Sequence, residues 1–352
     1  MSAAGWRRAA GVGVAIAGAA AAAAAGGLAA QRTIAARRAG RGEAADLGSL
    51  HAAPHTVVAD DGVPLHVEVD EPDHKPATGA PTLVFIHGYT LDLDCWHFQR
   101  AGLRGEHRMV FYDQRSHGRS GRSSADNSTL EQLGRDLAAV LEAEVPTGPL
   151  VLIGHSMGGM SLLAWAEQHP DIVGQRVAGV ALLATSSGAV GKLLPGGPGR
   201  MLDRAQPLVA AALARVPWLV ETGRRSTAFA LTRQLAFGGD VPDSYVLFVD
   251  QMISQTPSDV IWEFYPSIRA HERAHVLASF GAIPALVVGG GNDHVLPVAH
   301  SERIAEALPA ARLIRIEGAG HMLILEAHAE VSSALADLVV AAATPKPRRV
   351  RA

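Results

Sequence analysis

The strongest constraint on the fold of this chain is a series of short apolar runs that alternate with longer amphipathic segments. The runs are rich in β-branched residues and therefore predict β-strands. They are Thr56–Ala59, Leu65–Val69, Thr82–Ile86, Met109–Tyr112, Leu150–Ile153, Val177–Leu183, Ala285–Val288 and Leu313–Ile316. The later runs are almost continuously apolar, which is typical of strands that are buried on both faces of a parallel sheet.

Helical patterns lie between the later runs and complete the prediction of the fold class. They cover Leu130–Glu144, Met157–Gln168, Pro297–Leu308 and His321–Ala342. This alternation predicts an α/β domain, in which right-handed crossovers connect the parallel strands of an open sheet. The rhythm breaks between about residues 187 and 280, where many Pro and Gly residues interrupt helical pieces. We predict that this stretch is a mainly helical cap over the strand ends, inserted in a domain of about residues 50–345.

The composition excludes several classes of protein. Of the 352 residues, 48% are apolar and 18% are charged, which supplies a sizeable core and excludes a disordered or fibrous chain. The 31 basic and 34 acidic residues give a formal net charge of −3, so the chain has no basic field for a nucleic-acid partner. The single cysteine, Cys95, excludes an intrachain disulfide and a cysteine-based metal cluster.

Residues 1–45 form a separate Ala/Gly-rich segment and linker. Arg7 and Arg8 precede an uncharged run, residues 9–30, which is long enough to cross a bilayer as a helix, since about 20 residues suffice. Because the run has few strongly apolar side chains, an anchor, an export signal and a flexible tail all stay open. We predict membrane association through this run, and leave open whether the protein is anchored, exported or cytoplasmic. The basic residues 346–352 are interpreted as a solvated tail.

The clearest chemical motif is Gly154-His155-Ser156-Met157-Gly158, which joins a buried apolar run to a helical pattern. Small residues two positions before and two after Ser156 allow a sharp strand-to-helix turn that exposes the hydroxyl. The amino terminus of the following helix then points at developing negative charge. The Gly-x-Ser-x-Gly spacing is weak evidence by itself, but its context makes Ser156 a candidate nucleophile.

A serine hydroxyl is a poor nucleophile at neutral pH and needs an adjacent base. His321 is the best candidate, because it lies in a glycine-bracketed loop after the last predicted strand. The base needs an orienting carboxylate, and Asp293 follows the preceding predicted strand at its carboxyl end. The chain order Ser156, Asp293, His321 is the order expected for a catalytic triad on this architecture. His294 and Glu317 are weaker candidates nearby.

Acyl transfer also needs hydrogen-bond donors for the oxyanion of the tetrahedral intermediate. One expected donor is the backbone N–H of Met157, directly after the candidate nucleophile. The second is expected from the loop His87-Gly88-Tyr89-Thr90 after an earlier strand, and we assign it to the backbone N–H of Tyr89. We expect the His87 side chain to fix this loop.

These motifs resemble those of the α/β-hydrolase superfamily, and the chain from about Thr56 to Ala342 is similar to its bacterial serine esterase and lipase-like members. The segment Asp113-Gln-Arg-Ser116-His-Gly-Arg-Ser120 adds to the resemblance. Ser116 departs from it, because relatives usually carry glycine there, and we expect a positive φ at this turn.

The resemblance implies an α/β-hydrolase fold, with a mostly parallel eight-stranded sheet, helices on both faces and a mainly helical cap insertion. It also implies hydrolysis of an ester or amide through an acyl-enzyme, with Ser156, His321 and Asp293 as the triad and with no cofactor. A serine at the turn disfavours the dehalogenase and epoxide-hydrolase branches, which carry aspartate there.

A rival motif points to a different chemistry. The segment His271-Glu272-Arg273-Ala274-His275 matches His-Glu-x-x-His, which on a helix presents two imidazoles to a zinc ion. Such a site needs a third ligand, whereas Gly281, Pro284 and a predicted strand follow the motif. We therefore predict no metal in the active site, and the meaning of the motif stays open.

The sequence constrains the substrate loosely. The cap stretch is rich in aromatic residues, and we assign His155, Trp218, Phe248 and Trp262 to the substrate pocket. The helical spacing of Tyr245, Phe248 and Met252 is, however, more typical of packing against the sheet. An apolar cap over the serine favours a small hydrophobic or acyl ester as the partner.

Other functions stay open on the same framework. Carbon–carbon bond hydrolysis, thioester hydrolysis, aminopeptidase activity and cofactor-free perhydrolase activity would all share these motifs, because a fold does not choose among chemistries. A ligand-binding module without turnover is a further alternative. The oligomeric state is not predicted by the sequence.

Overall fold

The structure is a computed structural model of the chain, and it describes residues 46–188, 190 and 229–343. The predicted N-terminal segment, the basic tail and Trp218 lie outside the described residues, so what was expected of them stays a prediction. Within the described ranges, no helix combines the length and the apolar character that crossing a bilayer requires.

The described residues form an eight-stranded sheet in the order β1-β2-β4-β3-β5-β6-β7-β8. The strands are β1 (Pro54–Val58), β2 (Pro64–Asp70), β3 (Thr82–Ile86), β4 (Met109–Tyr112), β5 (Leu150–His155), β6 (Val177–Leu183), β7 (Ala285–Gly290) and β8 (Ala311–Ile316). β2 pairs antiparallel with β1 and β4, whereas all other pairings are parallel. The eight predicted strands are confirmed, with small shifts at their ends, because β-branched runs bounded by turn residues have a strong strand preference.

The period-two alternation of strand side chains divides the core into two layers, one on each face of the sheet. Val84, Val110 and Leu152 point to one face, where they belong to a buried apolar cluster. The helices that contribute to this cluster are α3 (Leu130–Glu144), α4 (Met157–Gln168), α5 (Pro170–Arg176), α10 (Ala299–Ala307) and the 3-10 helix η3 (Ala274–Phe280).

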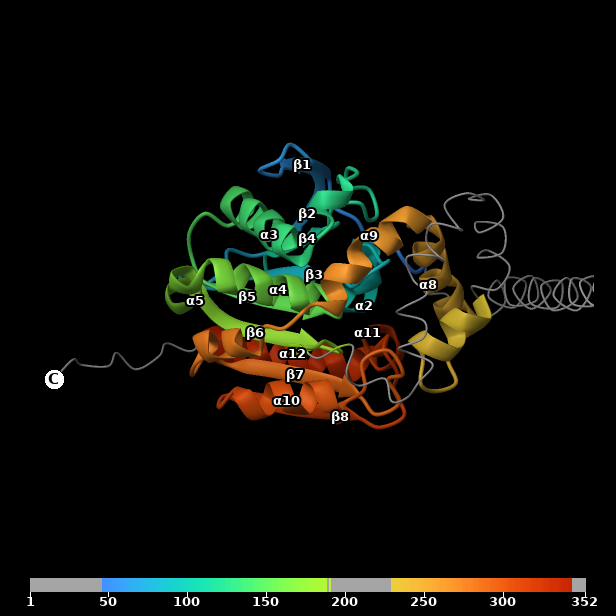
Figure 1. The fold of residues 1–352 in the computed structure, drawn as a ribbon. Helices are drawn as coiled ribbons and strands as arrows, with labels where there is room; N and C mark the ends of the chain where they lie inside the picture. Colours follow the sequence, from blue (N-terminus) through green and yellow to red (C-terminus); the bar gives the residue numbers. More distant parts are fainter. Residues whose placement is uncertain (1–45, 189, 191–228, 344–352) are drawn as a thin grey trace, which may run out of the picture.

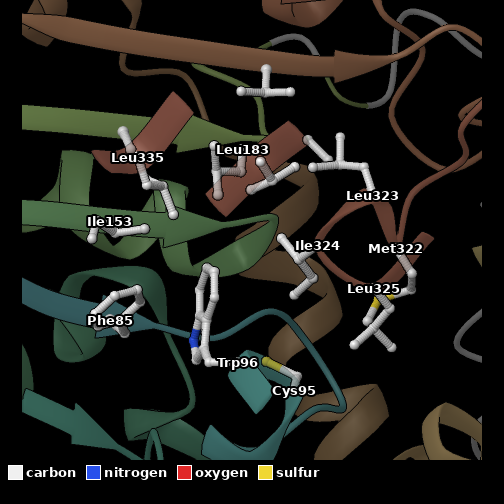
Figure 2. Packing of buried hydrophobic residues seen from close by; sticks show 14 of the residues in the cluster. Phe85, Cys95, Trp96, Ile153, Leu183, Met322, Leu323, Ile324, Leu325 and Leu335 are labelled. Carbon is white, nitrogen blue, oxygen red and sulfur yellow. The ribbon is translucent and has the colours of Figure 1, made fainter. Parts of the chain in front are cut away.

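The neighbouring residues Phe85, Phe111 and Ile153 point to the opposite face. That face is covered by η1 (Leu93–Trp96), α2 (His97–Leu103), α11 (Leu323–Glu326) and α12 (His328–Ala343). Figure 2 shows Phe85, Ile153 and Leu183 from neighbouring strands, with Trp96 close to them. The rings of Phe85 and Trp96 meet edge to face, with their centroids 5.2 Å apart. Helices therefore cover both faces of the sheet, as predicted (Figure 1).

Two predicted elements differ in detail. Only Ile316 of β8 is buried, and Leu313 is 40% exposed. β8 is an edge strand, so the expectation that the later strands are buried on both faces is wrong for it. The helix predicted over residues 321–342 is divided, because α11 ends at Glu326 and α12 begins at His328.

The connection from β6 to β7 contains the predicted helical cap. Its described part consists of a helix at residues 229–236, α8 (Asp243–Gln255), α9 (Ser258–Arg269) and the 3-10 helix η3 (Ala274–Phe280). In Figure 1, α8 lies beyond the arrowheads of the parallel strands. Residues 191–228 of the predicted insertion lie outside the described residues, so the limits of the cap stay a prediction.

A buried ion-pair network fixes the loop after β4 to α3. Arg115 is 0% exposed and donates two hydrogen bonds of 2.6 Å to the carboxylate of Asp136, which is also fully buried. The same guanidinium donates to Asp61 at 2.7 and 2.9 Å. Burial raises the pKa of Asp136 above its ordinary value, so this carboxylate depends on Arg115 to stay charged.

Replacement of Arg115 by leucine should lower the free energy of unfolding by about 3–5 kcal/mol, because the carboxylate of Asp136 would lose its buried partner. The matched control is Arg312→Leu, which removes an ion pair with Asp337 whose side chains are 59% and 63% exposed. This control should cost about 1 kcal/mol or less. Urea unfolding measures both values, and equal losses in the two variants would contradict the importance of the buried network.

Candidate active site

Ser156 lies at the turn between β5 and α4, at the carboxyl edge of the parallel strands. Its backbone has φ 52° and ψ −120°, a conformation that is strained for residues other than glycine. The Ser156 N–H donates to the Leu183 carbonyl at 3.0 Å, and the Thr185 hydroxyl donates to the Ser156 carbonyl at 2.6 Å. The sharp turn expected from the sequence is therefore present, and the end of β6 holds it in place.

Glycine is required next to this turn because α4 begins in direct contact with the sheet. A Cβ atom on Gly158 would lie 2.0 Å from the carbonyl oxygen of Ile86 and 2.6 Å from that of His87. A Cβ atom on Gly154 would lie 2.6 Å from the backbone nitrogen of Gly159. The absence of side chains at both positions lets α4 approach β3 closely enough to form the turn.

The structure brings Ser156, His321 and Asp293 into one hydrogen-bonded series. Ser156 Oγ lies 2.9 Å from His321 Nε2, and His321 Nδ1 lies 2.8 Å from Asp293 Oδ2. The three residues follow β5, β8 and β7, and the carboxyl ends of parallel strands share one edge of the sheet. Residues 165 positions apart in the chain meet there for this reason. The alternative acidic candidate, Glu317, is exposed and pairs with Arg315.

Asp293 stays ionised despite its burial. Burial alone would raise its pKa, but the charge and hydrogen bond of His321 and the backbone N–H groups of Leu296 and Val295 outweigh this effect and hold the pKa below its ordinary value. Both N–H groups lie 2.8 Å from Asp293 Oδ1. An ionised Asp293 accepts the Nδ1 proton of His321, which leaves Nε2 as the acceptor that faces the Ser156 hydroxyl.

Two further histidines are buried beneath the site. His155 Nε2 donates to the carbonyl oxygen of His321 at 3.0 Å, and burial lowers the pKa of His155 to about 3, so its imidazole is neutral. His87 Nε2 accepts the backbone N–H of Gln114 at 2.8 Å, and its Nδ1 donates to the Gly88 carbonyl at 2.8 Å. The expectation that His87 fixes its loop is confirmed by these contacts.

The two residues assigned as oxyanion donors border the same cavity as Ser156. Met157 is the first residue of α4, and the first backbone N–H groups of a helix have no acceptor within that helix. Tyr89 is anchored by its side chain, because the phenol donates to the carbonyl oxygen of Ile261 in α9. Their role toward an oxyanion stays a prediction.

A cavity of about 500 Å³ opens at Ser156 and His321. This volume lies within the range of about 300–1,000 Å³ that is usual for sites that bind small molecules. Most of the described residues that line it have aliphatic side chains, among them Met160 from α4, Val249 and Ile253 from α8 and Ile268 from α9. Such walls exclude water and favour an apolar ligand.

The assignment of His155, Phe248 and Trp262 to the substrate pocket is corrected by this cavity, because none of them is among its lining residues. His155 is 0% exposed and faces Trp96, with ring centroids 6.3 Å apart. Trp262 packs against the ring of Tyr265, which itself lines the cavity.

Helix geometry explains the error for Phe248. Successive residues of an α-helix point about 100° apart, so Val249 faces the cavity while Phe248 packs toward Gly48. Tyr245 and Met252 are buried in the core, as their helical spacing suggested.

The His-Glu-x-x-His segment does not form one α-helix, because only Ala274 and His275 are helical and they begin the 3-10 helix η3. His271 and Glu272 lie between α9 and η3, and Glu272 forms an isolated β-bridge with Gly188. His271 Nε2 donates to the Ser186 carbonyl at 2.9 Å, whereas the exposed His275 pairs with Glu167. The described part of the chain contains no group of three or more His, Cys, Asp or Glu side chains arranged to hold a metal ion.

Ser116, which occupies a position where the resemblance implies glycine, has the predicted backbone conformation. Its φ is 64°, in the left-handed region that glycine adopts without strain. The Ser116 hydroxyl accepts the backbone N–H of Ser123 at 2.8 Å, which stabilises the turn. The substitution of glycine by serine is therefore accommodated by a local hydrogen bond.

Sequence reasoning missed several residues that support the site. Thr185 lies two residues after Leu183, the last residue of β6, and this position just beyond the carboxyl end of a parallel strand is the signal that could have identified it. Val249 and Ile253 are four positions apart, which places them on one face of α8, and this aliphatic spacing is the signal that could have identified them. The backbone donors to Asp293 carry no sequence signal.

Comparisons with known proteins agree with this fold. A family model described as "alpha/beta hydrolase fold" matches residues 81–328. Among curated proteins, a "dihydrolipoyllysine-residue acetyltransferase component of acetoin cleaving system" from Pseudomonas putida is 29% identical over 261 residues, or 72% of this chain. The alignment spans 62% of that protein, which is less than two thirds of its length.

Two solved structures illustrate the similarity of fold. An esterase from Thermogutta terrifontis has a TM-score of 0.64 and 24% identity, and the match covers 83% of this chain and 100% of that chain. An enol-lactonase from Burkholderia xenovorans has a TM-score of 0.64 and 23% identity, covering 81% of this chain and 100% of that chain. At these identities the likeness concerns the fold alone.

Replacement of Gly158 by alanine should destabilise the protein by several kcal/mol, because the new Cβ would overlap the backbone of β3 and force α4 away from the sheet. The matched control is Gly174→Ala in α5, where a Cβ atom would meet nothing within 4 Å. This control should be neutral or more stable by about 0.5–1 kcal/mol. Thermal unfolding compares the two, and a stable Gly158→Ala protein would contradict the tight approach of α4.

Proposed function

The chain belongs to the α/β-hydrolase fold family, and we propose that it is a serine hydrolase that cleaves hydrophobic carboxylic esters through an acyl-enzyme. The observation that carries the proposal is the hydrogen-bonded series Ser156–His321–Asp293 at the base of an apolar cavity. A hydroxyl, an imidazole and a carboxylate in this order are the parts that acyl transfer needs.

In the proposed mechanism, His321 Nε2 removes the proton of the Ser156 hydroxyl while Oγ attacks the carbonyl carbon of the ester. The imidazolium then gives this proton to the oxygen of the leaving alcohol, which leaves an acyl group on Ser156. Water attacks the acyl-enzyme with His321 again as the base, and the carboxylic acid departs. Asp293 holds the required tautomer and stabilises the imidazolium.

The proposed oxyanion donors are the backbone N–H groups of Met157 and Tyr89. Each such donor typically lowers the barrier by about 3 kcal/mol, because it is oriented before charge develops on the carbonyl oxygen. Two hydrogen bonds support this assignment. One joins the Gln114 N–H to His87, and the other joins the Tyr89 phenol to α9. Both restrict the conformation of the backbone at Tyr89.

The apolar walls of the cavity support a hydrophobic ester as the substrate class. A charged substrate would lose much of its hydration among these mainly apolar side chains, and Arg269 is the one Lys, Arg, Asp or Glu side chain among the described lining residues. The names of the relatives include an esterase, an enol-lactonase and an acetyltransferase component. These names share the cleavage or transfer of an acyl group, whereas a magnesium-chelatase subunit and a bromoperoxidase are also among the similar proteins.

Replacement of Ser156 by alanine should abolish labelling by a fluorophosphonate probe and turnover of p-nitrophenyl esters, because the only proposed nucleophile is removed. The variant should unfold at the temperature of the wild type. The control is Ser279→Ala, where the lost hydroxyl donates to the Val276 carbonyl in η3. The control should label normally, and persistent labelling of the Ser156 variant would assign the nucleophile to another residue.

Replacement of Asp293 by asparagine should reduce kcat by about 10³- to 10⁴-fold with little change in KM, because the amide no longer holds the Nδ1–H tautomer of His321. Steady-state kinetics on p-nitrophenyl butyrate measures this loss. The matched control is Glu317→Gln, at the exposed acidic residue of the same region, which should keep its turnover. A similar loss in both variants would contradict the assignment of Asp293.

A further inference from the structure

The described residues that precede β1 run along the domain and are tied to it by hydrogen bonds. Residues 46–52 are called here the strap. The Ala52 N–H donates to the buried carboxylate of Glu68 in β2 at 3.0 Å. The guanidinium of Arg104 donates to the His51 carbonyl at 2.8 Å. One end of the strap is therefore attached to the sheet and to the residue that follows α2.

The other end of the strap reaches the cap at Gly48. The Gly48 N–H donates to His97 Nδ1 in α2 at 3.2 Å, and the Gly48 backbone has φ 79°, in the left-handed region. A Cβ atom at this position would lie 3.0 Å from Cε2 of Phe248 in α8, whereas carbon atoms in ordinary contact are about 3.5–4.0 Å apart. The strap backbone therefore lies directly against the ring of Phe248.

The contact between Gly48 and Phe248 supports α8 on a side where the packing is open. A second cavity, of about 340 Å³, lies beside this contact and is lined by Leu47 and Gly48 of the strap and by Phe248 and Gln251 of α8. Elsewhere α8 packs on the domain, for example through the rings of Tyr245 and Phe98, whose centroids are 5.5 Å apart. Because close packing fixes the position of a helix, the few atoms that touch beside an open space have a large influence on it.

The position of α8 determines part of the lining of the active-site cavity. Val249 is the residue after Phe248, and Ile253 follows one helical turn later; both line the cavity at Ser156. The hydrogen bonds of an α-helix join successive turns, so neighbouring residues move together. A displacement of the Phe248 ring would therefore move Val249 and Ile253 relative to the nucleophile.

We propose that the strap is a positioning element of the active site, which acts through Gly48 and Phe248 to set the place of α8 and thereby the size of ester that fits. The proposal rests on the proposed function and adds to it a determinant of specificity outside the cavity. No residue of the strap is among those that line the cavity. Gly48 and Phe248 are thus positioning residues, because they act on the substrate only through α8.

The test compares Gly48→Ala with the matched control Gly79→Ala, both in the full chain. Gly79 lies between β2 and β3 and has φ 81°, and a Cβ atom there would meet nothing within 4 Å. Both variants place alanine in the left-handed region and carry similar backbone strain. Only Gly48→Ala also pushes against an aromatic ring, so a difference between the two variants reports the contact with α8.

The measured quantity is kcat/KM for butyl butyrate relative to ethyl acetate, followed by titration of the released acid. Butyl butyrate is longer on both sides of the scissile bond, so the comparison holds whichever side of the ester faces α8. Gly48→Ala should lower this ratio about tenfold, because the displaced side chains of α8 no longer match the larger ester. Gly79→Ala should keep the ratio of the wild type.

A double-mutant cycle with Phe248→Ala tests whether the effect passes through the ring. In the Phe248→Ala background, the additional Gly48→Ala change should leave the ratio unaltered, because the new methyl group has no ring to displace. A tenfold loss in both backgrounds would overturn the proposal. An equal loss in the Gly48→Ala and Gly79→Ala variants, or no loss in Gly48→Ala, would overturn it as well.

If Gly48→Ala does not fold, as judged by its thermal transition, Gly48→Asn and Gly79→Asn carry the same expectation, because asparagine adopts the left-handed region more readily than alanine. Failure of the proposed function would look different. The wild-type chain would then hydrolyse neither ester and would not react with a fluorophosphonate, which would overturn both proposals. Active wild-type protein with an unchanged ratio in Gly48→Ala would overturn the role of the strap alone.

Discussion

The site depends on one strained turn, which exists because α4 can touch the sheet. When a helix directly follows a strand, the chain must change direction within one or two residues. Here the positive φ of Ser156 produces this change of direction. Contact between the start of α4 and the Ile86 carbonyl is possible only without a side chain at Gly158. The strain at Ser156 is thus balanced by backbone packing and by hydrogen bonds with Leu183 and Thr185 at the end of β6.

The charged and hydrogen-bonding side chains of the site meet at the carboxyl edge of the sheet. Because the parallel strands end at one edge of the sheet, the loops after β7 and β8 place Asp293 and His321 next to Ser156. The three side chains are therefore long enough to form hydrogen bonds with one another. The buried carboxylate keeps its charge through two backbone N–H groups and the imidazole. His155 and His87, which are neutral and fully buried, support the loops from below through bonds to the backbone.

The cap helices supply side chains that line the cavity at the site. The β6–β7 connection supplies α8, which lines the cavity with Val249 and Ile253, and α9, which lines it with Tyr265, Ile268 and Arg269. Other residues of both helices pack in the core. The same scaffold could surround the serine with different side chains without any change in the sheet. The triad residues thus follow strands of the sheet, whereas the cavity is lined by described residues of the cap together with residues of α4 and of the loop after β3.

The sequence by itself determined the strands, the strand-to-helix turn and the identity of Ser156, Asp293 and His321 as candidates, because each depends on local patterns and on chain order. The positive φ of Ser116 was expected from the resemblance, and the structural use of His87 from its place in the loop after a strand. Only the tertiary structure decided that β8 is an exposed edge and that the His-Glu-x-x-His segment does not form one α-helix. It also decided that Val249 rather than Phe248 faces the cavity, since the direction of a side chain depends on what its helix packs against.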